Sequence, residues 1–144
     1  MKVDLSAIDS GFDLIPSGKY PARITDGEVR EAGPNAKYPG SEYINWEFTL
    51  TEDAGEYAGR KQWTNTSLRP EALFGLKALL ESSGLWNKEE LNAPDFDFDI
   101  DELFGEEVTL VVAVTQYQGE DQNTVKRIRP AGQATGSAGS SLLP

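Results

Sequence analysis

Aromatic side chains stand close to lysine or arginine at several places in the chain, and this pairing suits binding better than catalysis. Lys37 is followed directly by Tyr38, and Lys61 comes shortly before Trp63. Aromatic rings can stack on nucleic-acid bases while cations contact the phosphates, and each stacked base contributes roughly 1–3 kcal/mol. A basic residue beside an aromatic one therefore suits a binding surface with stacking contacts, and these residue types alone do not name its ligand.

Catalytic chemistry has little support in the composition. The chain has no cysteine and no histidine. It therefore lacks a thiolate nucleophile, a Cys-ligated zinc site, the commonest general base and a Ser-His-Asp triad. Carboxylates, lysine or tyrosine can still carry out acid–base chemistry, but no spacing in the chain calls for it. We predict a protein that is not an enzyme and has no cofactor.

One acidic run can be compared with a calcium-binding loop. Asp95, Asp97, Asp99 and Glu106 stand at the first, third, fifth and twelfth positions of an EF-hand loop. Ile100 occupies the sixth position, where the turn needs glycine, and no flanking pair of helices is predicted. We favour the alternative, an acidic surface segment whose alternating phenylalanines and Ile100 pack inward, and we predict no metal site.

The net charge of −11 argues against a nucleic-acid partner until its distribution is considered. Residues 88–107 hold nine acidic residues and one basic residue, whereas the rest of the chain holds 15 acidic and 12 basic residues. A basic groove on one face is therefore compatible with this sequence. The acidic segment also supports a second hypothesis, a protein-interaction module that docks another protein without binding nucleic acid.

Five segments show the alternation of half-buried β-strands, and they cover residues 19–31, 42–50, 60–68, 107–117 and 123–129. In the second segment Ile44, Trp46 and Phe48 alternate with polar residues, so we predict Trp46 and Phe48 in the core. In the first segment the apolar parity changes after Gly27, which predicts a β-bulge that bends the strand.

A single amphipathic helix is expected after the third strand. Pro70 suits the first helical position and Gly84 suits the C-cap, which places the helix over residues 70–83. Its predicted core stripe consists of Ala72, Leu73, Leu76, Leu79 and Leu80. A helical turn is expected over residues 99–104, and three large apolar residues are expected to tuck under the domain: Trp86, Leu91 and Phe104.

The two ends of the chain differ in composition from its middle. Residues 1–15 are expected to form an irregular arm anchored by Phe12 or Leu14, and residues 131–144 a flexible Gly/Ser/Ala tail. Residues 16–130 then form one domain. The N-terminal segment has no apolar signal-peptide core, and the apolar run Val108–Val114 is too short to span a bilayer. We therefore expect a cytoplasmic protein with no membrane partner.

The element order predicts a mainly β fold. Three strands, one helix and two further strands follow each other along the chain. This is the order of an OB-fold, a five-stranded Greek-key β-barrel with its helix between strands three and four. We therefore predict an OB-fold-like barrel with one helix.

Turn and core residues spread over residues 16–130 give the chain a resemblance to a known family. They are Gly18 and Tyr20; Gly55, Tyr57, Gly59 and Arg60 in a G-x-Y-x-G-R turn; Trp63, Asn65, Leu68, Pro70, Leu73, Lys77 and Gly84; Gly105 and Val108; and Tyr117, Gly119 and Asn123. With these motifs the chain resembles a phage-encoded family, long labelled as a phage domain of unknown function, whose members are regarded as OB-fold single-stranded-DNA-binding proteins. The resemblance implies single-stranded DNA and phage or host replication or recombination proteins as partners, in the host cytoplasm.

An OB-fold carries its ligand on strands two and three and on the loops after strands one and four. Mapping this surface onto the chain gives ten candidate binding residues: Lys37, Tyr38, Tyr43, Arg60, Lys61, Trp63, Tyr117, Lys126, Arg127 and Arg129.

Two of these assignments depend on which way side chains face. Trp63 shares its face with Lys61, yet the third strand has no other large apolar residue for the core, so stacking and core both remain open for Trp63. Lys126, Arg127 and Arg129 span both faces of one strand, so at most two of them should share a groove.

Overall fold

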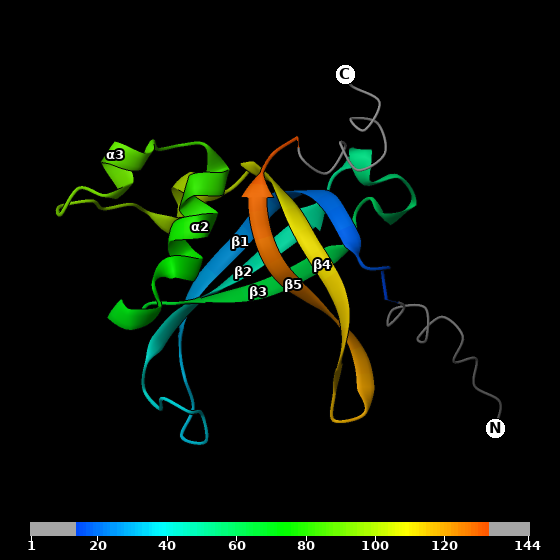
Figure 1. Cartoon of the computed structure of the whole chain (residues 1–144), viewed down its shortest axis with the longest axis horizontal. Coiled ribbons are helices and arrows are strands. Elements are labelled where there is room, and N and C mark those ends of the chain that lie inside the picture. Colours follow the sequence, from blue (N-terminus) through cyan, green and yellow to red (C-terminus); the bar gives the residue numbers. More distant parts are fainter. Residues whose placement is uncertain (1–13, 133–144) are drawn as a thin grey trace.

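Five antiparallel strands form one strongly curved sheet in this computed structural model, which describes residues 14–132 (Figure 1). The order across the sheet is β3-β2-β1-β4-β5. A mainly β fold is therefore confirmed. The strands are β1 (Gly18–Glu31), β2 (Glu42–Leu50), β3 (Lys61–Ser67), β4 (Glu107–Tyr117) and β5 (Glu120–Pro130). The edge strands β3 and β5 approach each other, although the described residues show no strand pairing between them.

The long strand β1 joins the two halves of the sheet. Its first part pairs with β4 and its later part with β2. The predicted bulge is present, but the register shifts between Ile24 and Asp26, which makes Thr25 the extra residue. Gly27 has another role, because a Cβ there would lie 2.9 Å from the ring of Trp46. Gly27 therefore allows the backbone to pass directly over a buried indole.

The core lies on the inner face of the sheet. Trp46 and Phe48 are both fully buried, which confirms their prediction. The inner face of β3 is polar, because Gln62 and Thr66 are its buried residues. The indole nitrogen of Trp46 donates a hydrogen bond of 2.8 Å to the Thr66 hydroxyl. Trp46 thus fills the space beside β3 and also satisfies a buried polar group there.

The helical segment after β3 has two parts. A 3₁₀ turn, η2 (Pro70–Ala72), precedes α2 (Phe74–Ser83), which ends at Gly84 in the left-handed conformation with φ of 78°. Leu76, Leu79 and Leu80 are buried as predicted. The prediction that Leu73 belongs to the buried stripe is wrong, because this residue is exposed. The change from 3₁₀ to α geometry at Leu73 turns its side chain away from the core.

The segment between α2 and β4 contains two more short helices, α3 (Lys88–Leu91) and η3 (Ile100–Leu103). Asn87 and Glu90 form a capping box at α3, a helix that the sequence analysis missed. Phe104 was expected to be covered but is exposed, and Leu103 is buried in its place because η3 ends one residue earlier.

The acidic run that begins at Asp95 forms a surface segment whose apolar side chains pack inward, which is the alternative that the sequence favoured over a calcium-binding loop. Phe96 and Phe98 stack on each other with ring centroids 6.1 Å apart, and both rings contact Trp86 edge-on. With Ile100 they pack against the core, while Asp95, Asp97 and Asp99 remain exposed. Within residues 14–132 no group of three carboxylates comes together as a metal ion would need.

A two-residue turn at Gln118 and Gly119 joins β4 to β5. Both residues have positive φ, 52° and 83°, as a type I′ hairpin turn requires. Because this turn is so tight, β5 begins at Glu120, earlier than predicted. Between β2 and β3 lies η1 (Glu52–Tyr57), a 3₁₀ segment that is kinked at Gly55, where φ is 66°.

The chain enters the sheet through Ile15. This residue is fully buried, and its backbone N–H and C=O both bond to the Asn123 side chain, at 3.0 and 2.8 Å. Leu14 is exposed, so it is not the predicted anchor. Phe12, with the rest of the arm before residue 14, and the tail over residues 133–144 lie outside the described residues. In the described ranges no helix is long and apolar enough to cross a bilayer.

Candidate nucleic-acid interface

The outer face of β2 and β3 carries a mixed aromatic and polar surface. Tyr43 pairs across the strands with Ser67, Asn45 with Asn65, and Glu47 with Trp63. Trp63 is 55% exposed, so it belongs to this outer face and not to the core. The structure therefore decides between the two alternatives that the sequence left open for the location of Trp63.

Tyr38 stands at the edge of this face, in the loop between β1 and β2. This residue is 44% exposed. The Cζ atom of Arg69 lies 3.4 Å from the ring centroid, and the Nζ atom of Lys37 lies 5.5 Å from it. Arg69 also pairs with Glu71. The sequence analysis missed Arg69, because its contact with Tyr38 joins segments far apart in the chain.

A hollow of about 340 Å³ opens between this loop and the sheet. Its walls include Tyr38, Tyr43, Ser67, Asn65 and Arg69. We call it the loop hollow. Three of the ten candidates, Lys37, Tyr38 and Tyr43, therefore come together around one opening.

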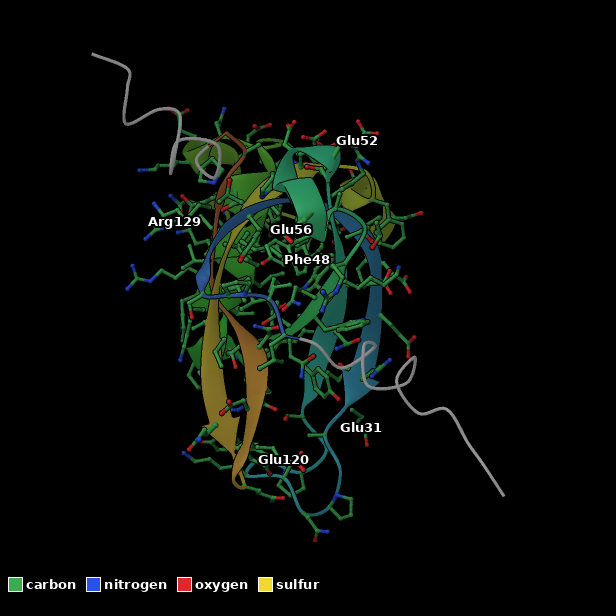
Figure 2. All side chains as sticks on the ribbon, turned by 90° about the vertical axis from the view of Figure 1, so that its right-hand side faces the viewer. Glu31, Phe48, Glu52, Glu56, Glu120 and Arg129 are labelled. Atoms are coloured by element: carbon green, nitrogen blue, oxygen red, sulfur yellow. The ribbon has the colours of Figure 1, made fainter. Side chains whose placement is uncertain are left out.

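The loop between β1 and β2 and the turn between β4 and β5 project from the same end of the sheet (Figure 1). In the turned view Glu31, which ends β1, and Glu120, which begins β5, again lie toward one end, while Glu52 and Glu56 lie at the other (Figure 2). Tyr117 is 62% exposed near the β4–β5 turn. Arg60 precedes β3 and follows η1, so it lies at the opposite end from Tyr38 and does not join the loop hollow.

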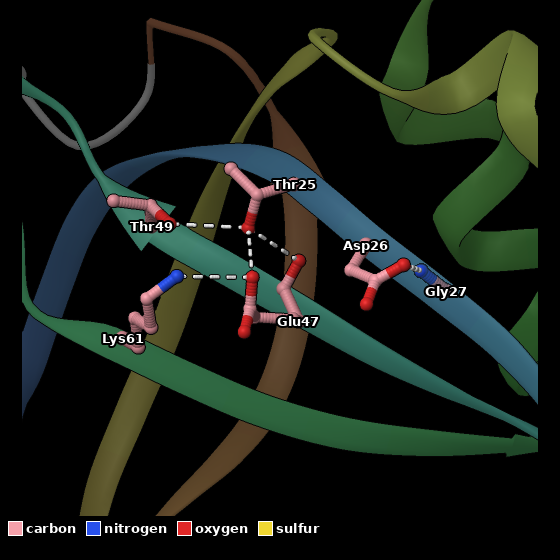
Figure 3. Close-up of polar contacts among 6 residues, drawn as sticks. All are labelled: Thr25, Asp26, Gly27, Glu47, Thr49 and Lys61. Atoms are coloured by element: carbon pink, nitrogen blue, oxygen red, sulfur yellow. Dashed lines mark hydrogen bonds and ion pairs between the residues drawn. The ribbon is translucent and has the colours of Figure 1, made fainter.

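A carboxylate stands in the middle of the outer face. Glu47 accepts hydrogen bonds from the Thr25 hydroxyl at 2.8 Å and from Lys61 Nζ at 3.1 Å (Figure 3). The Thr25 bond first, and the Lys61 bond second, hold the pKa of Glu47 below its ordinary value. The charge of Lys61 is therefore largely balanced by Glu47, which weakens the case for Lys61 as a phosphate contact.

The three cations of β5 lie together, contrary to the expectation that at most two could share a groove. Val111 pairs with Arg127 and Val112 with Val125, so Lys126 is the extra residue of a β-bulge. The bulge breaks the alternation of the strand, and Lys126, Arg127 and Arg129 line the same two hollows. Figure 2 shows Arg129 pointing outward from the molecule, whereas Phe48 lies inside it.

The sequence matches no family model and no curated protein. The resemblance to phage single-strand-binding proteins therefore stays a prediction. The functional proposals below depend on the geometry and charge of this chain.

Replacing Glu47 by glutamine is expected to strengthen binding of oligo-dT by roughly 2- to 5-fold at low salt. The substitution removes a carboxylate from the outer face and releases Lys61 from its ion pair. Fluorescence anisotropy with a labelled oligonucleotide measures the change. Glu89→Gln is the matched control, because it removes the same charge from the exposed start of α3 and should leave the affinity unchanged.

The same variant should alter the pH dependence of stability. Because the folded-state pKa of Glu47 is lowered, its contribution to the free energy of unfolding is present above its unfolded pKa. That contribution is lost as the pH falls through the folded-state pKa. In urea titrations at acidic pH, the free energy of unfolding of Glu47→Gln should therefore fall less with decreasing pH than that of the wild-type protein. The assigned role of Glu47 would be contradicted if the variant kept both the wild-type affinity for oligo-dT and the wild-type loss of stability at acidic pH.

Proposed function

We propose that the protein binds single-stranded DNA without sequence preference, and that its sheet is an OB-fold-like Greek-key barrel. Two observations support the barrel. The sheet order places β3 and β5 at its edges, and these edges approach each other. Along the chain α2 follows β3 and precedes β4, and it packs against β5. An OB-fold has this element order and carries its ligand on the face of β2 and β3.

The observation that carries the proposal is the loop hollow with its neighbouring rings. Tyr38, Tyr43 and Trp63 present aromatic surface on or beside one face of the sheet, and none of them is buried. Lys37 places positive charge near the ring of Tyr38, and Arg69, which is paired with Glu71, lies over the same ring. Aromatic faces and cations in this arrangement can hold unstacked bases and the phosphates between them.

A single strand suits this surface better than a duplex. Stacking on a protein ring requires a free base face, which a duplex buries between neighbouring base pairs. The polar neighbours, Asn45 and Asn65, bond to each other at 2.7 Å, so this pair gives no evidence of base-specific readout. Binding by stacking and phosphate contacts is therefore expected to tolerate any sequence.

A role in phage DNA replication or recombination, in the cytoplasm of a host cell, is the biological setting that we propose. It rests on the family resemblance of the turn and core residues. Phage or host replication and recombination proteins are then the natural protein partners.

The test is a fluorescence-anisotropy titration with labelled oligo-dT of about 16 nucleotides and with a duplex of the same length. We expect saturable binding of oligo-dT at low salt, weaker binding of the duplex and a loss of affinity as salt increases. Absence of binding at roughly 50 μM protein, or equal affinity for the two forms, would overturn the proposal.

A further inference from the structure

A second hollow, of about 500 Å³, lies on the far side of the β3 edge. We call it the helix hollow, because Phe74, Gly75 and Ala78 of α2 form one of its walls. Residues 64–66 of β3 form a second wall, and residues 125–129 of β5 form the third. The outer-face surface around Tyr38 and Tyr43 does not account for this site.

Phe74 is 79% exposed at the rim of the helix hollow. It lies off the buried stripe of Leu76, Leu79 and Leu80, so its ring is not part of the core. An apolar ring of this size left in water costs free energy unless something covers it. Its ring is therefore accessible to a flat, apolar group at the opening of the hollow.

The opposite wall of the helix hollow is cationic. Lys126, Arg127 and Arg129 line it, and all three are exposed. The same three residues also line a third hollow of about 540 Å³, which Lys19 and Val111 complete. Cross-strand pairing sets this arrangement, because Val111 lies between Lys19 on β1 and Arg127 on β5. We call it the sheet hollow.

None of these four cations forms an ion pair within residues 14–132. The pattern differs from that of Arg23, Lys61 and Arg69, whose charges are balanced by glutamates. Glu81 lines a small adjoining hollow with Arg129 but is not paired with it. In a chain of net charge −11, four clustered and unpaired cations indicate an anionic ligand.

The three hollows adjoin one another, because neighbouring hollows share lining residues. Asn65 lines both the loop hollow and the helix hollow. Lys126, Arg127 and Arg129 line both the helix hollow and the sheet hollow. A ligand that leaves the Tyr38 end can therefore cross the β3 edge, pass Phe74 and reach Lys19 along one surface.

We propose that one nucleic-acid strand follows this whole path, with a base stacked on Phe74 and its phosphates held by Lys126, Arg127, Arg129 and Lys19. This inference rests on the proposed function and extends its site. A strand combines flat bases with regularly spaced phosphates, which matches an exposed ring facing a row of cations. An acidic peptide would match the cations alone, so it serves as the competing outcome in the test.

The first test compares two strand lengths. Oligo-dT of about 4 nucleotides can occupy the loop hollow alone, whereas about 16 nucleotides can cover the path. The triple variant Lys126→Gln, Arg127→Gln, Arg129→Gln should reduce the slope of log affinity against log salt by about 2 for the long strand. The short strand should keep its wild-type affinity and slope.

Gly75 offers a second variant that does not remove any cation. A Cβ atom at this position would meet nothing within 4 Å, so a side chain can begin there without a clash. Gly75→Glu places a carboxylate in the helix hollow and should weaken binding of the long strand by roughly tenfold, while the short strand is unaffected. Lys77→Gln is the control on the same helix, because Lys77 does not line the hollow. Thermal unfolding shows that each variant is folded.

Each outcome separates this inference from the proposed function. If wild-type protein binds the short strand but the long strand gains no affinity, or if the triple variant keeps its salt slope, the path is overturned and binding at the loop hollow stands. If neither strand binds, the proposed function fails with it. If polyglutamate binds more tightly than oligo-dT and the triple variant loses polyglutamate, the cations serve an acidic peptide and the nucleic-acid path is wrong.

Discussion

Replacing Tyr38 and Tyr43 together by alanine should weaken oligo-dT binding by roughly 30-fold or more. Both rings border the loop hollow, and loss of two stacked bases at roughly 1–3 kcal/mol each gives an effect of this size. The fold should be unaffected, because Tyr38 lies in an exposed loop and Tyr43 is only half-buried on the outer face. Anisotropy titrations measure the affinity, and far-UV circular dichroism checks the fold.

The matched control replaces both tyrosines by phenylalanine. This change keeps the rings and removes the hydroxyl groups, so near-wild-type affinity is expected if stacking carries the binding. A folded alanine double variant with wild-type affinity would exclude the loop hollow as the binding site. Equal losses in the alanine and phenylalanine variants would show that the hydroxyl groups, and not the rings, are responsible.

Replacing Trp46 by alanine should lower the free energy of unfolding by about 3–5 kcal/mol. The indole is fully buried, it packs under the backbone at Gly27, and its nitrogen bonds to Thr66. The substitution opens a cavity and also leaves the Thr66 hydroxyl without its partner. Urea unfolding followed by circular dichroism gives the change.

Trp63→Ala is the paired control for this prediction. Trp63 lies on the outer face and is 55% exposed, so its loss should change the free energy of unfolding by no more than about 0.5 kcal/mol. A loss below roughly 1 kcal/mol in Trp46→Ala, or an equal loss in the two variants, would contradict the assignment of Trp46 to the core and Trp63 to the surface.

The strands were predictable where one face is apolar and the other is polar. β2 shows this alternation along its whole length, and its bounds and its core residues follow the prediction. The α2 helix ends at Gly84 as expected, because a left-handed C-cap favours glycine strongly. The alternation of β2 and the C-cap of α2 could be predicted because each depends only on residues close together in the chain.

The features that sequence could not predict depend on pairing between distant segments. The bulge that brings Lys126 and Arg127 to the same hollows is defined by the register of β5 against β4. The location of Trp63 was ambiguous because β3 has a polar inner face, and that face is compatible with a core only because Trp46 fills the space beside Thr66. Arg69 meets Tyr38 through tertiary structure alone.

One missed residue did leave a signal in the sequence. Phe74 falls outside the spacing of Leu76, Leu79 and Leu80, so helical periodicity places it off the buried stripe. The spacing therefore predicts an exposed ring, and the structure places that ring in the lining of the same hollow as the cations of β5.

The outer face of β2 and β3 is not uniformly basic, and this affects how a strand can lie on it. Glu47 balances Lys61 at the centre of the face, whereas the four cations of the sheet hollow, which form no ion pair within residues 14–132, lie beyond the β3 edge. Stacking should therefore dominate near Tyr38 and Tyr43, and phosphate contacts should dominate near β5. Strand length and salt concentration separate these two contributions.

The most direct measurement of the central claim is a titration of ¹⁵N-labelled protein with oligo-dT, followed by two-dimensional ¹H–¹⁵N NMR. The claim predicts shifts of the backbone amides of Tyr38 and Tyr43 and of the exposed Trp63 indole N–H. The Trp46 indole N–H, buried and bonded to Thr66, should remain in place. A spectrum that does not change, or shifts confined to the acidic segment over residues 88–107, would contradict binding of a single strand on this face.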